Sequence, residues 1–141
     1  MNKQDLGFEI HLNLPHDQAV ENVTAALKTE GFGVLTRIDM RATMKEKLGV
    51  DFRPYTILGA CNPPLAYRAL SADSLTGLLL PCNVTVEAAI EGGSVVQITD
   101  PEVMLTVGAL GENETLRQIS KEAQAKLIRV AEILVQLGAT A

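Results

Sequence analysis

The sequence predicts an α+β two-layer sandwich, in which one mostly antiparallel sheet carries helices on one face. Apolar residues recur with a period of two in several short segments, which is typical of strands. In two longer segments they recur at three- and four-residue steps, which is typical of amphipathic helices. The resulting order is strand, helix, four strands and helix, with short extra helices in the connections. With 141 residues, 47% of them hydrophobic, we expect one domain over 1–141 and a core from about 8 to 137.

The first strand is predicted from residue 8 to residue 14, where apolar and polar side chains alternate. Pro15 ends this strand, and a helix follows because five apolar residues then share one helical face. These residues are Ala19, Val20, Val23, Ala26 and Leu27. Gly31 is expected to end the helix, because glycine readily adopts the left-handed conformation and Phe32 can then fold back onto Leu27.

The middle of the chain is expected to hold two strands and two short helices. A second strand is predicted over 33–40 and a short helix over about 43–48, which Gly49 ends. Residues 55–61 form a third strand with mostly apolar residues on both faces, which indicates an interior strand. Asn62 and Pro63 then begin a helix over 63–70, because asparagine caps helices and proline is favoured at the first helical position.

The remaining segments complete the sheet and cover it. A fourth strand is predicted over 78–89 and a fifth over 95–99, joined by a turn at Gly92 and Gly93. A short helix begins at Pro101 and runs to about 107. The final helix, over about 113–137, is expected to be the main cover of the sheet. Its apolar stripe comprises Leu116, Ile119, Ala123, Leu127, Val130, Leu134 and Leu137.

Composition and charge exclude several classes of function. The net charge of −5 and the lack of a Lys/Arg run argue against nucleic acid and anionic membrane surfaces as partners. No window approaches the roughly 18 apolar residues of a membrane span, and the first five residues are too polar for a secretory signal, so we expect a cytoplasmic protein. Two cysteines are too few for a disulfide scaffold, which favours free thiols.

Four short phrases carry a resemblance to a known family. They are Gly31-Phe32-Gly33, Leu48-Gly49-Val50-Asp51-Phe52, Leu58-Gly59-Ala60-Cys61-Asn62-Pro63 and Leu79-Leu80-Pro81-Cys82-Asn83-Val84. On these phrases the chain resembles the domain-of-unknown-function 302 family, over about residues 8 to 137. The resemblance implies a fold of the TATA-box-binding-protein-like type and a homodimer. It implies no established activity, so it supplies a fold without a mechanism.

The two cysteines mark the best candidate site, because each begins a similar phrase where a predicted strand meets turn residues. If the third and fourth strands are antiparallel, both cysteines lie at the same rim of the sheet. Cys61 also precedes a helix N-terminus, where the helix dipole favours the thiolate and lowers the thiol pKa. Arg53 could contact an anionic ligand. The predicted pocket residues are Tyr55, Cys61, Asn62, Pro81, Cys82, Asn83 and Arg53.

Three functions fit this pattern. In the leading hypothesis the chain binds a small ligand or a partner at the rim pocket, with no specified catalysis. In the second it is a thiol-dependent redox or sulfur-handling protein, with Cys61 as the reactive sulfur and Cys82 as its partner. In the third it is a structural homodimeric interaction module whose cysteines only pack, as buried cysteines often do.

Metal binding and the two histidines have less support in the sequence. Two thiols without a nearby histidine or carboxylate fall short of a four-ligand zinc set, so we assign no metal and no cofactor. His11 and His16 lack a partner at motif spacing and are expected to be solvated surface residues. We therefore assign no catalytic histidine.

Overall fold

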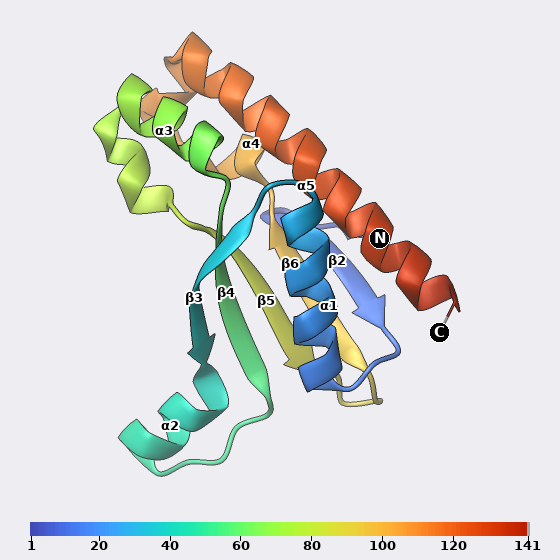
Figure 1. Ribbon diagram of the computed structural model, residues 1–141. Helices are drawn as coiled ribbons and strands as arrows, with labels where there is room; N and C mark the ends of the chain where they lie inside the picture. Colours follow the sequence, from blue (N-terminus) through green and yellow to red (C-terminus); the bar gives the residue numbers. More distant parts are fainter. Residues whose placement is uncertain (141) are drawn as a thin grey trace.

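The computed structural model describes residues 1–140, with side chains as far as Gly138. Its centre is a six-stranded antiparallel sheet in the order β1-β2-β6-β5-β4-β3. The strands are β1 (Asn2–Lys3), β2 (Gly7–Leu12), β3 (Gly33–Asp39), β4 (Tyr55–Cys61), β5 (Cys82–Ala88) and β6 (Ser94–Thr99). Helices α1 (His16–Thr29) and α5 (Glu114–Thr140) lie on one face of this sheet (Figure 1). The predicted α+β sandwich is confirmed.

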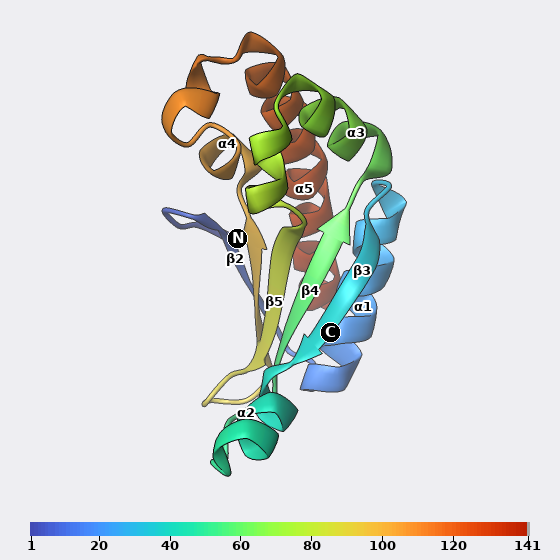
Figure 2. The same cartoon turned by 90° about the vertical axis from the view of Figure 1, so that its left-hand side faces the viewer.

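Three shorter α-helices and two 3-10 helices occupy the ends of the sheet. They are α2 (Met40–Leu48), α3 (Pro63–Ala72), η1 (Ser74–Leu79), α4 (Pro101–Met104) and η2 (Gly108–Glu112). Helix α2 lies at one end, whereas α3 and α4 lie at the other end beside the first turns of α5 (Figures 1 and 2). Within residues 1–140, none of the helices combines the length and the apolar character that a membrane span requires.

The end of α1 forms as its sequence predicts. Gly31 has a φ of 83°. The Phe32 N–H donates to the Leu27 carbonyl oxygen at 3.0 Å, and the Gly31 N–H donates to that of Lys28 at 3.1 Å. These two bonds are the Schellman arrangement, which satisfies carbonyls that the helix end would otherwise leave unpaired. The chain then turns back along the sheet as β3.

Two predicted boundaries are wrong, because side chains outside the apolar pattern set them. The strand expected from residue 78 begins only at Cys82, since Asp73 accepts a hydrogen bond from the Leu75 N–H at 2.9 Å and starts the 3-10 helix η1. The peptide bond between Leu80 and Pro81 is cis. Helix α2 begins at Met40 rather than at 43, because the Asp39 carboxylate caps it.

Two further elements differ from expectation. The helix predicted from Pro101 to about 107 ends at Met104. The sequence also gave no sign of β1, a two-residue edge strand in which Lys3 pairs with Phe8. Such a short strand of exposed polar residues cannot show a period of two.

The buried residues form two clusters rather than one. The larger lies between the sheet and helices α1 and α5, where Leu127, Val130 and Leu134 of α5 contact it. The smaller joins α3 to the first half of α5 and contains Leu65, Ala69, Leu116, Ile119 and Ala123. Only the C-terminal half of α5 therefore covers the sheet, and α1 shares that role (Figure 1). The prediction of α5 as the main cover holds for half of its length.

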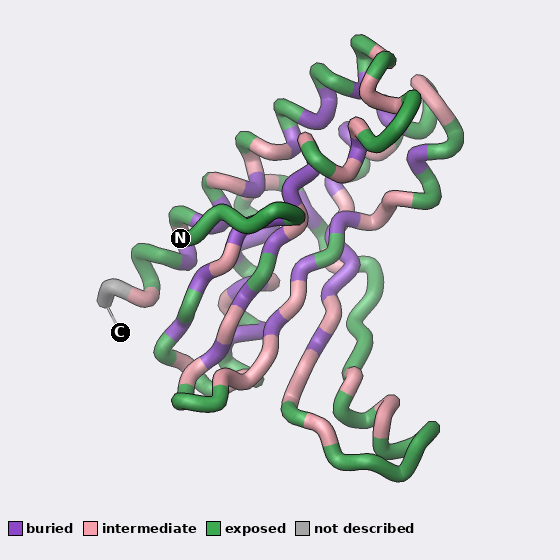
Figure 3. Tube along the Cα trace, turned by 180° about the vertical axis from the view of Figure 1, so that it is seen from behind, coloured by how far each residue is buried: buried purple, intermediate pink, exposed green. Residues whose placement is uncertain are grey.

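The opposite face of the sheet is uncovered, and we call it the open face. None of the helices that the structure describes lies over it (Figure 3). Side chains along each strand alternate between the two faces. On β4, β5 and β6 the open face carries Tyr55, Ile57, Gly59, Cys61, Asn83, Thr85, Glu87, Val95, Gln97 and Thr99.

Candidate functional site

The two cysteines lie at the same rim of the sheet. Strands β4 and β5 are antiparallel, so the end of β4 lies beside the start of β5. Ala60 lies opposite Cys82 in the register. Cys61 ends β4, and Cys82 begins β5. Helix α3 follows Cys61 after one residue.

The register nevertheless sends the two thiols to opposite faces. Cys82 lies opposite Ala60 and shares the helix-covered face with Val84, so it is buried. Cys61 is one residue further along β4, on the open face, and is half-buried. Burial raises the pKa of the Cys82 thiol to about 11, and the nearby Cys61 adds to the rise. Cys82 is therefore a neutral thiol at physiological pH.

Asn62 holds two helices together. Its Oδ1 accepts a hydrogen bond from the Leu65 N–H at 3.3 Å, as expected of a helix cap. Its Nδ2 donates to the Glu30 carbonyl oxygen at 3.1 Å, at the end of α1. A Cβ on Gly31 would lie only 3.0 Å from this Nδ2. Both ends of the amide are thus used within the protein.

Pro81 fills the rim on the open face. It lies over Gly59 of β4, where an added Cβ would come within 2.8 Å of Pro81 Cγ and would also collide with Thr36 Oγ1. Glycine is favoured here, because any larger residue would displace the side chains of Pro81 and Thr36.

Arg53 and Tyr55 lie together at the margin of the open face. The Arg53 guanidinium donates from Nε to the Glu87 carboxylate at 2.6 Å. Its central carbon is 4.6 Å from the centre of the Phe52 ring and 5.6 Å from that of the Tyr55 ring. These contacts hold the guanidinium by charge and by cation–π attraction. Arg53 is thus engaged with its own chain.

Two cavities open on this face, one at each end of the central strands. A cavity of about 470 Å³ lies beside Arg53 and Glu87 and is also lined by His11 and Val95. The other, of about 200 Å³, lies beside Asn83 and is also lined by Thr85 and Gln97. Neither cavity includes a cysteine among its lining residues. Asn83 and Arg53 are therefore the predicted site residues that border open space on this face.

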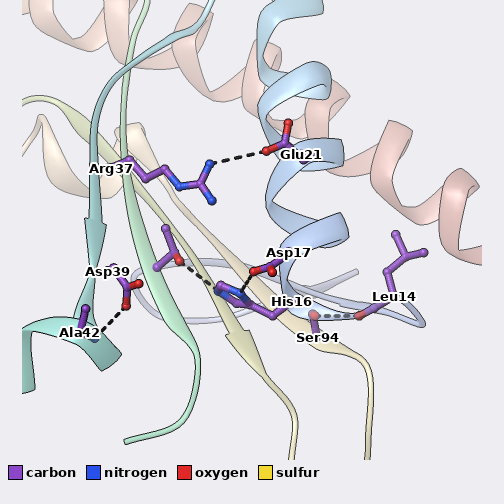
Figure 4. Close-up of polar contacts among 9 residues, drawn as sticks. Leu14, His16, Asp17, Glu21, Arg37, Asp39, Ala42 and Ser94 are labelled. Atoms are coloured by element: carbon purple, nitrogen blue, oxygen red, sulfur yellow. Dashed lines mark hydrogen bonds and ion pairs between the residues drawn. The ribbon is translucent and has the colours of Figure 1, made fainter. Parts of the chain in front are cut away.

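The His16 side chain makes polar contacts that the sequence did not reveal. Its side chain is only 14% exposed, with Nε2 3.0 Å from Thr56 Oγ1 and Nδ1 3.0 Å from Asp17 Oδ1 (Figure 4). The expectation that His16 is a solvated surface residue is wrong, because α1 places it against β4. His11, in contrast, is exposed as expected.

The His16 cluster lies beside a third cavity, of about 280 Å³, that Asp39 and Arg41 also line. Its atom order, carboxylate to imidazole to hydroxyl, is that of a hydrolase triad. Thr56 is only 2% exposed, however, so its oxygen is covered and cannot meet a substrate. The cluster ties the first turn of α1 to β4. Among residues 1–140, no group of three His, Cys, Asp or Glu side chains is arranged to hold a metal ion.

Comparison with known families identifies this arrangement of strands and helices. The model of a family described as a domain of unknown function, DUF302, matches residues 8–134. The chain belongs to the DUF302 family. Its match to the family model extends from β2 into α5 and so includes both cysteine phrases.

A solved DUF302 protein has a similar fold. It is the crystal structure of an uncharacterized conserved DUF302 protein from Bacillus stearothermophilus, which is 27% identical to this chain. The alignment covers 95% of this chain and 99% of that one, with a TM-score of 0.79. A search of curated proteins gave no match. Membership in DUF302 therefore establishes the fold and leaves the activity to be argued from the site.

In this DUF302 domain the predicted rim residues divide into two groups. Tyr55, Cys61 and Asn83 lie on the open face, and Arg53 lies at its margin. Cys82 faces the helices, and the Asn62 amide caps α3. The sequence predicted which strands meet, whereas the separation of the groups follows from the register between them.

Proposed function

We propose that this DUF302 domain is a binding module that uses the open face as its recognition surface, and that its partner is a second copy of the chain. The observation that carries the proposal is the uncovered sheet face, which presents half-buried apolar side chains among its polar ones. These include Ile57 and Val95, with Ile38 at the edge of the face at 43% exposure. Ile38 and Ile57 are cross-strand neighbours, whereas Val95 lies beyond Glu87 of β5. Apolar side chains left uncovered on a sheet face are typical of interaction sites.

The charge of the open face supports pairing with a second copy. The whole chain carries a net charge of −5, which opposes self-association in general. On β4, β5 and β6, however, Glu87 is the only acidic or basic residue that faces outward, and Arg53 pairs with it. Two copies could therefore meet across these strands without bringing unpaired like charges together.

The size of the molecule is compatible with such a pairing. A standard protein interface buries about 800 Å² on each partner. The described chain exposes 7877 Å², so an interface of that size would take about a tenth of its surface. The central strands of a six-stranded sheet offer a single continuous area for this contact.

The ligand-binding and thiol-dependent hypotheses, which both concern the rim of the sheet, relate to this surface in different ways. A small ligand near Asn83 or Cys61 would bind within the same recognition surface, so the leading sequence hypothesis becomes part of this proposal. The thiol-dependent alternative has less support. Its two sulfurs lie on opposite faces, and burial raises the pKa of Cys82 to about 11, which opposes a thiolate at that position.

The test is the oligomeric state of a variant with a charge on β4 of the open face. Ile57→Glu places a carboxylate in the proposed interface, where burying it unpaired is costly. We expect a dimer for the unmodified chain and a monomer for Ile57→Glu, measured by light scattering after size exclusion and by native mass spectrometry. Circular dichroism establishes that the variant is folded.

The matched control is Leu78→Glu, because Leu78 lies in η1, away from the sheet, and is 82% exposed. This control should remain a dimer. The proposal fails if the unmodified chain is a monomer across the concentrations tested. It also fails if Ile57→Glu pairs as tightly as Leu78→Glu.

A further inference from the structure

The cavity beside Asn83 differs from the other hollows in the chemistry of its lining. Its polar side chains are all uncharged: Gln4, Asn83, Thr85, Gln97 and Thr99. The cavities beside Arg53 and beside His16 are both lined by acidic and basic residues. The Glu9 carboxylate lies opposite Gln97 in the register, but it is outside the lining and accepts a hydrogen bond from Gln4 Nε2 at 3.0 Å. A site that contacts its ligand only through amides and hydroxyls favours an uncharged molecule, because a buried charge needs an opposite charge nearby.

The cavity has free hydrogen-bonding groups. Within the described residues, the side-chain amides of Asn83 and Gln97 make no hydrogen bond, and neither does the Thr85 hydroxyl. Thr85 and Gln97 face each other across β5 and β6. Each side-chain amide offers both a donor and an acceptor, so it can form two parallel hydrogen bonds with another amide.

The walls of the cavity are held in place by backbone contacts. The Gln4 N–H donates to the Gly7 carbonyl oxygen at 2.7 Å, and the Asp100 N–H donates to that of Leu6 at 2.9 Å. Gly7 adds no side chain to the floor, and a Cβ there would collide with the Ile98 carbonyl oxygen. Leu6 is 67% exposed and supplies an apolar wall. A planar ring could lie against this wall while a polar group meets the amides.

We infer that this cavity binds a small, uncharged, planar molecule through a primary carboxamide. The carboxamide pairs with the side-chain amides of Gln97 and Asn83, and the ring lies against Leu6. The volume of about 200 Å³ suits a single ring rather than a larger ligand. This inference goes beyond the pairing of two copies, since the cavity is complete within one chain. The cavity opens on the face that a second copy would cover, so ligand and second copy compete, and binding is measured at concentrations at which the chain is monomeric.

Nicotinamide and nicotinate test this inference, because they share one ring and differ in carboxamide against carboxylate. Titration of the uniformly 15N-labelled chain with nicotinamide should shift the backbone signals of Asn83, Thr85 and Gln97, with a dissociation constant on the order of 1 mM. Nicotinate should bind at least about tenfold more weakly, because no cationic group lines the cavity to meet its charge.

Gln97→Ala is the informative variant, since Gln97 is exposed and its loss leaves the core intact. It should weaken nicotinamide binding about tenfold, the effect of losing a bidentate hydrogen bond. Gln18→Ala, on the exposed side of α1, is the matched control and should bind as the unmodified chain does.

Three results would overturn the inference: no shifts at the cavity, equal affinity for nicotinate, or unchanged affinity in Gln97→Ala. Light scattering gives the oligomeric state of each sample. A failure of two copies to pair can therefore be told apart from a failure to bind the ligand.

Discussion

The two faces of the central sheet are built from the same strands and differ in what covers them. On the helix-covered face, Leu58, Val84 and Val96 are fully buried. On the open face, the neighbouring residues Ile57 and Val95 are only half-buried. Since alternate residues of one strand have the same backbone environment, this difference arises from the helices alone. Packing explains the covered face, whereas an apolar side chain on the open face gains less from the fold, and for this reason we propose that it serves binding.

The test with the largest expected effect on stability replaces two neighbouring residues of β4 by alanine. Leu58→Ala removes a fully buried side chain and should lower the free energy of unfolding by about 2–5 kcal/mol. Ile57→Ala, on the open face, should cost about 1 kcal/mol or less, because little cavity forms. Urea unfolding at concentrations where the chain is monomeric measures both values. Equal losses would mean that the two faces are packed alike.

The second test uses the buried thiol of the covered face. The pKa of Cys82 is raised from its ordinary value of 9.0 to about 11, so the folded chain keeps this proton above pH 9 while the unfolded chain loses it. The free energy of unfolding should therefore be unaffected below pH 9 and fall by up to about 3 kcal/mol as the pH rises to 11.

The difference between the unmodified chain and Cys82→Ala isolates this contribution, because other groups titrate equally in both. Cys61→Ala, which alters the half-buried thiol of the open face, should retain most of the alkaline loss. An alkaline loss that persists unchanged in Cys82→Ala would show that Cys82 is not the group responsible. A Cys82 thiol that titrates well below pH 9 in the folded chain would revive the thiol-dependent hypothesis.

The test with the smallest expected effect compares two threonines on opposite faces of the sheet. Thr56→Val removes the hydroxyl that shares a 3.0 Å hydrogen bond with His16 Nε2, and should cost about 1 kcal/mol. Thr85→Val removes a hydroxyl without a hydrogen bond in the described chain, and should change the free energy of unfolding by less than about 0.5 kcal/mol. Thermal unfolding measured by circular dichroism resolves the two. A larger loss for Thr85→Val would reverse the assignment of the faces.

Features decided within a few residues of the chain were predictable from the sequence. The Asn62 cap and the Gly31 helix end depend on local backbone bonds, and both form as expected. The period of two likewise placed Tyr55, Ile57 and Cys61 on one face of β4. These signals sufficed for the fold class and for the meeting of both cysteines at one rim.

Features that depend on contacts between distant segments were not predictable. Both faces of β4 are apolar, so the pattern could not say which face the helices cover, and hence where Cys61 points. The contact of His16 with Thr56 spans 40 residues and follows from where α1 begins over the sheet. The polar start of η1, which delays β5, depends on the Asp73 side chain rather than on apolar spacing.

The division of α5 between two cores has a consequence for synthesis of the chain. Leu127, Val130 and Leu134, which cover the sheet, are made after every strand. A growing chain emerges from the ribosome at about 5–20 residues per second, so the strands are complete seconds before the half of α5 that covers them. During that interval the part of the covered face that packs against α5 lacks its partner. The nascent chain then depends on α1 alone to shield the strands, until the second half of α5 arrives and hides one face.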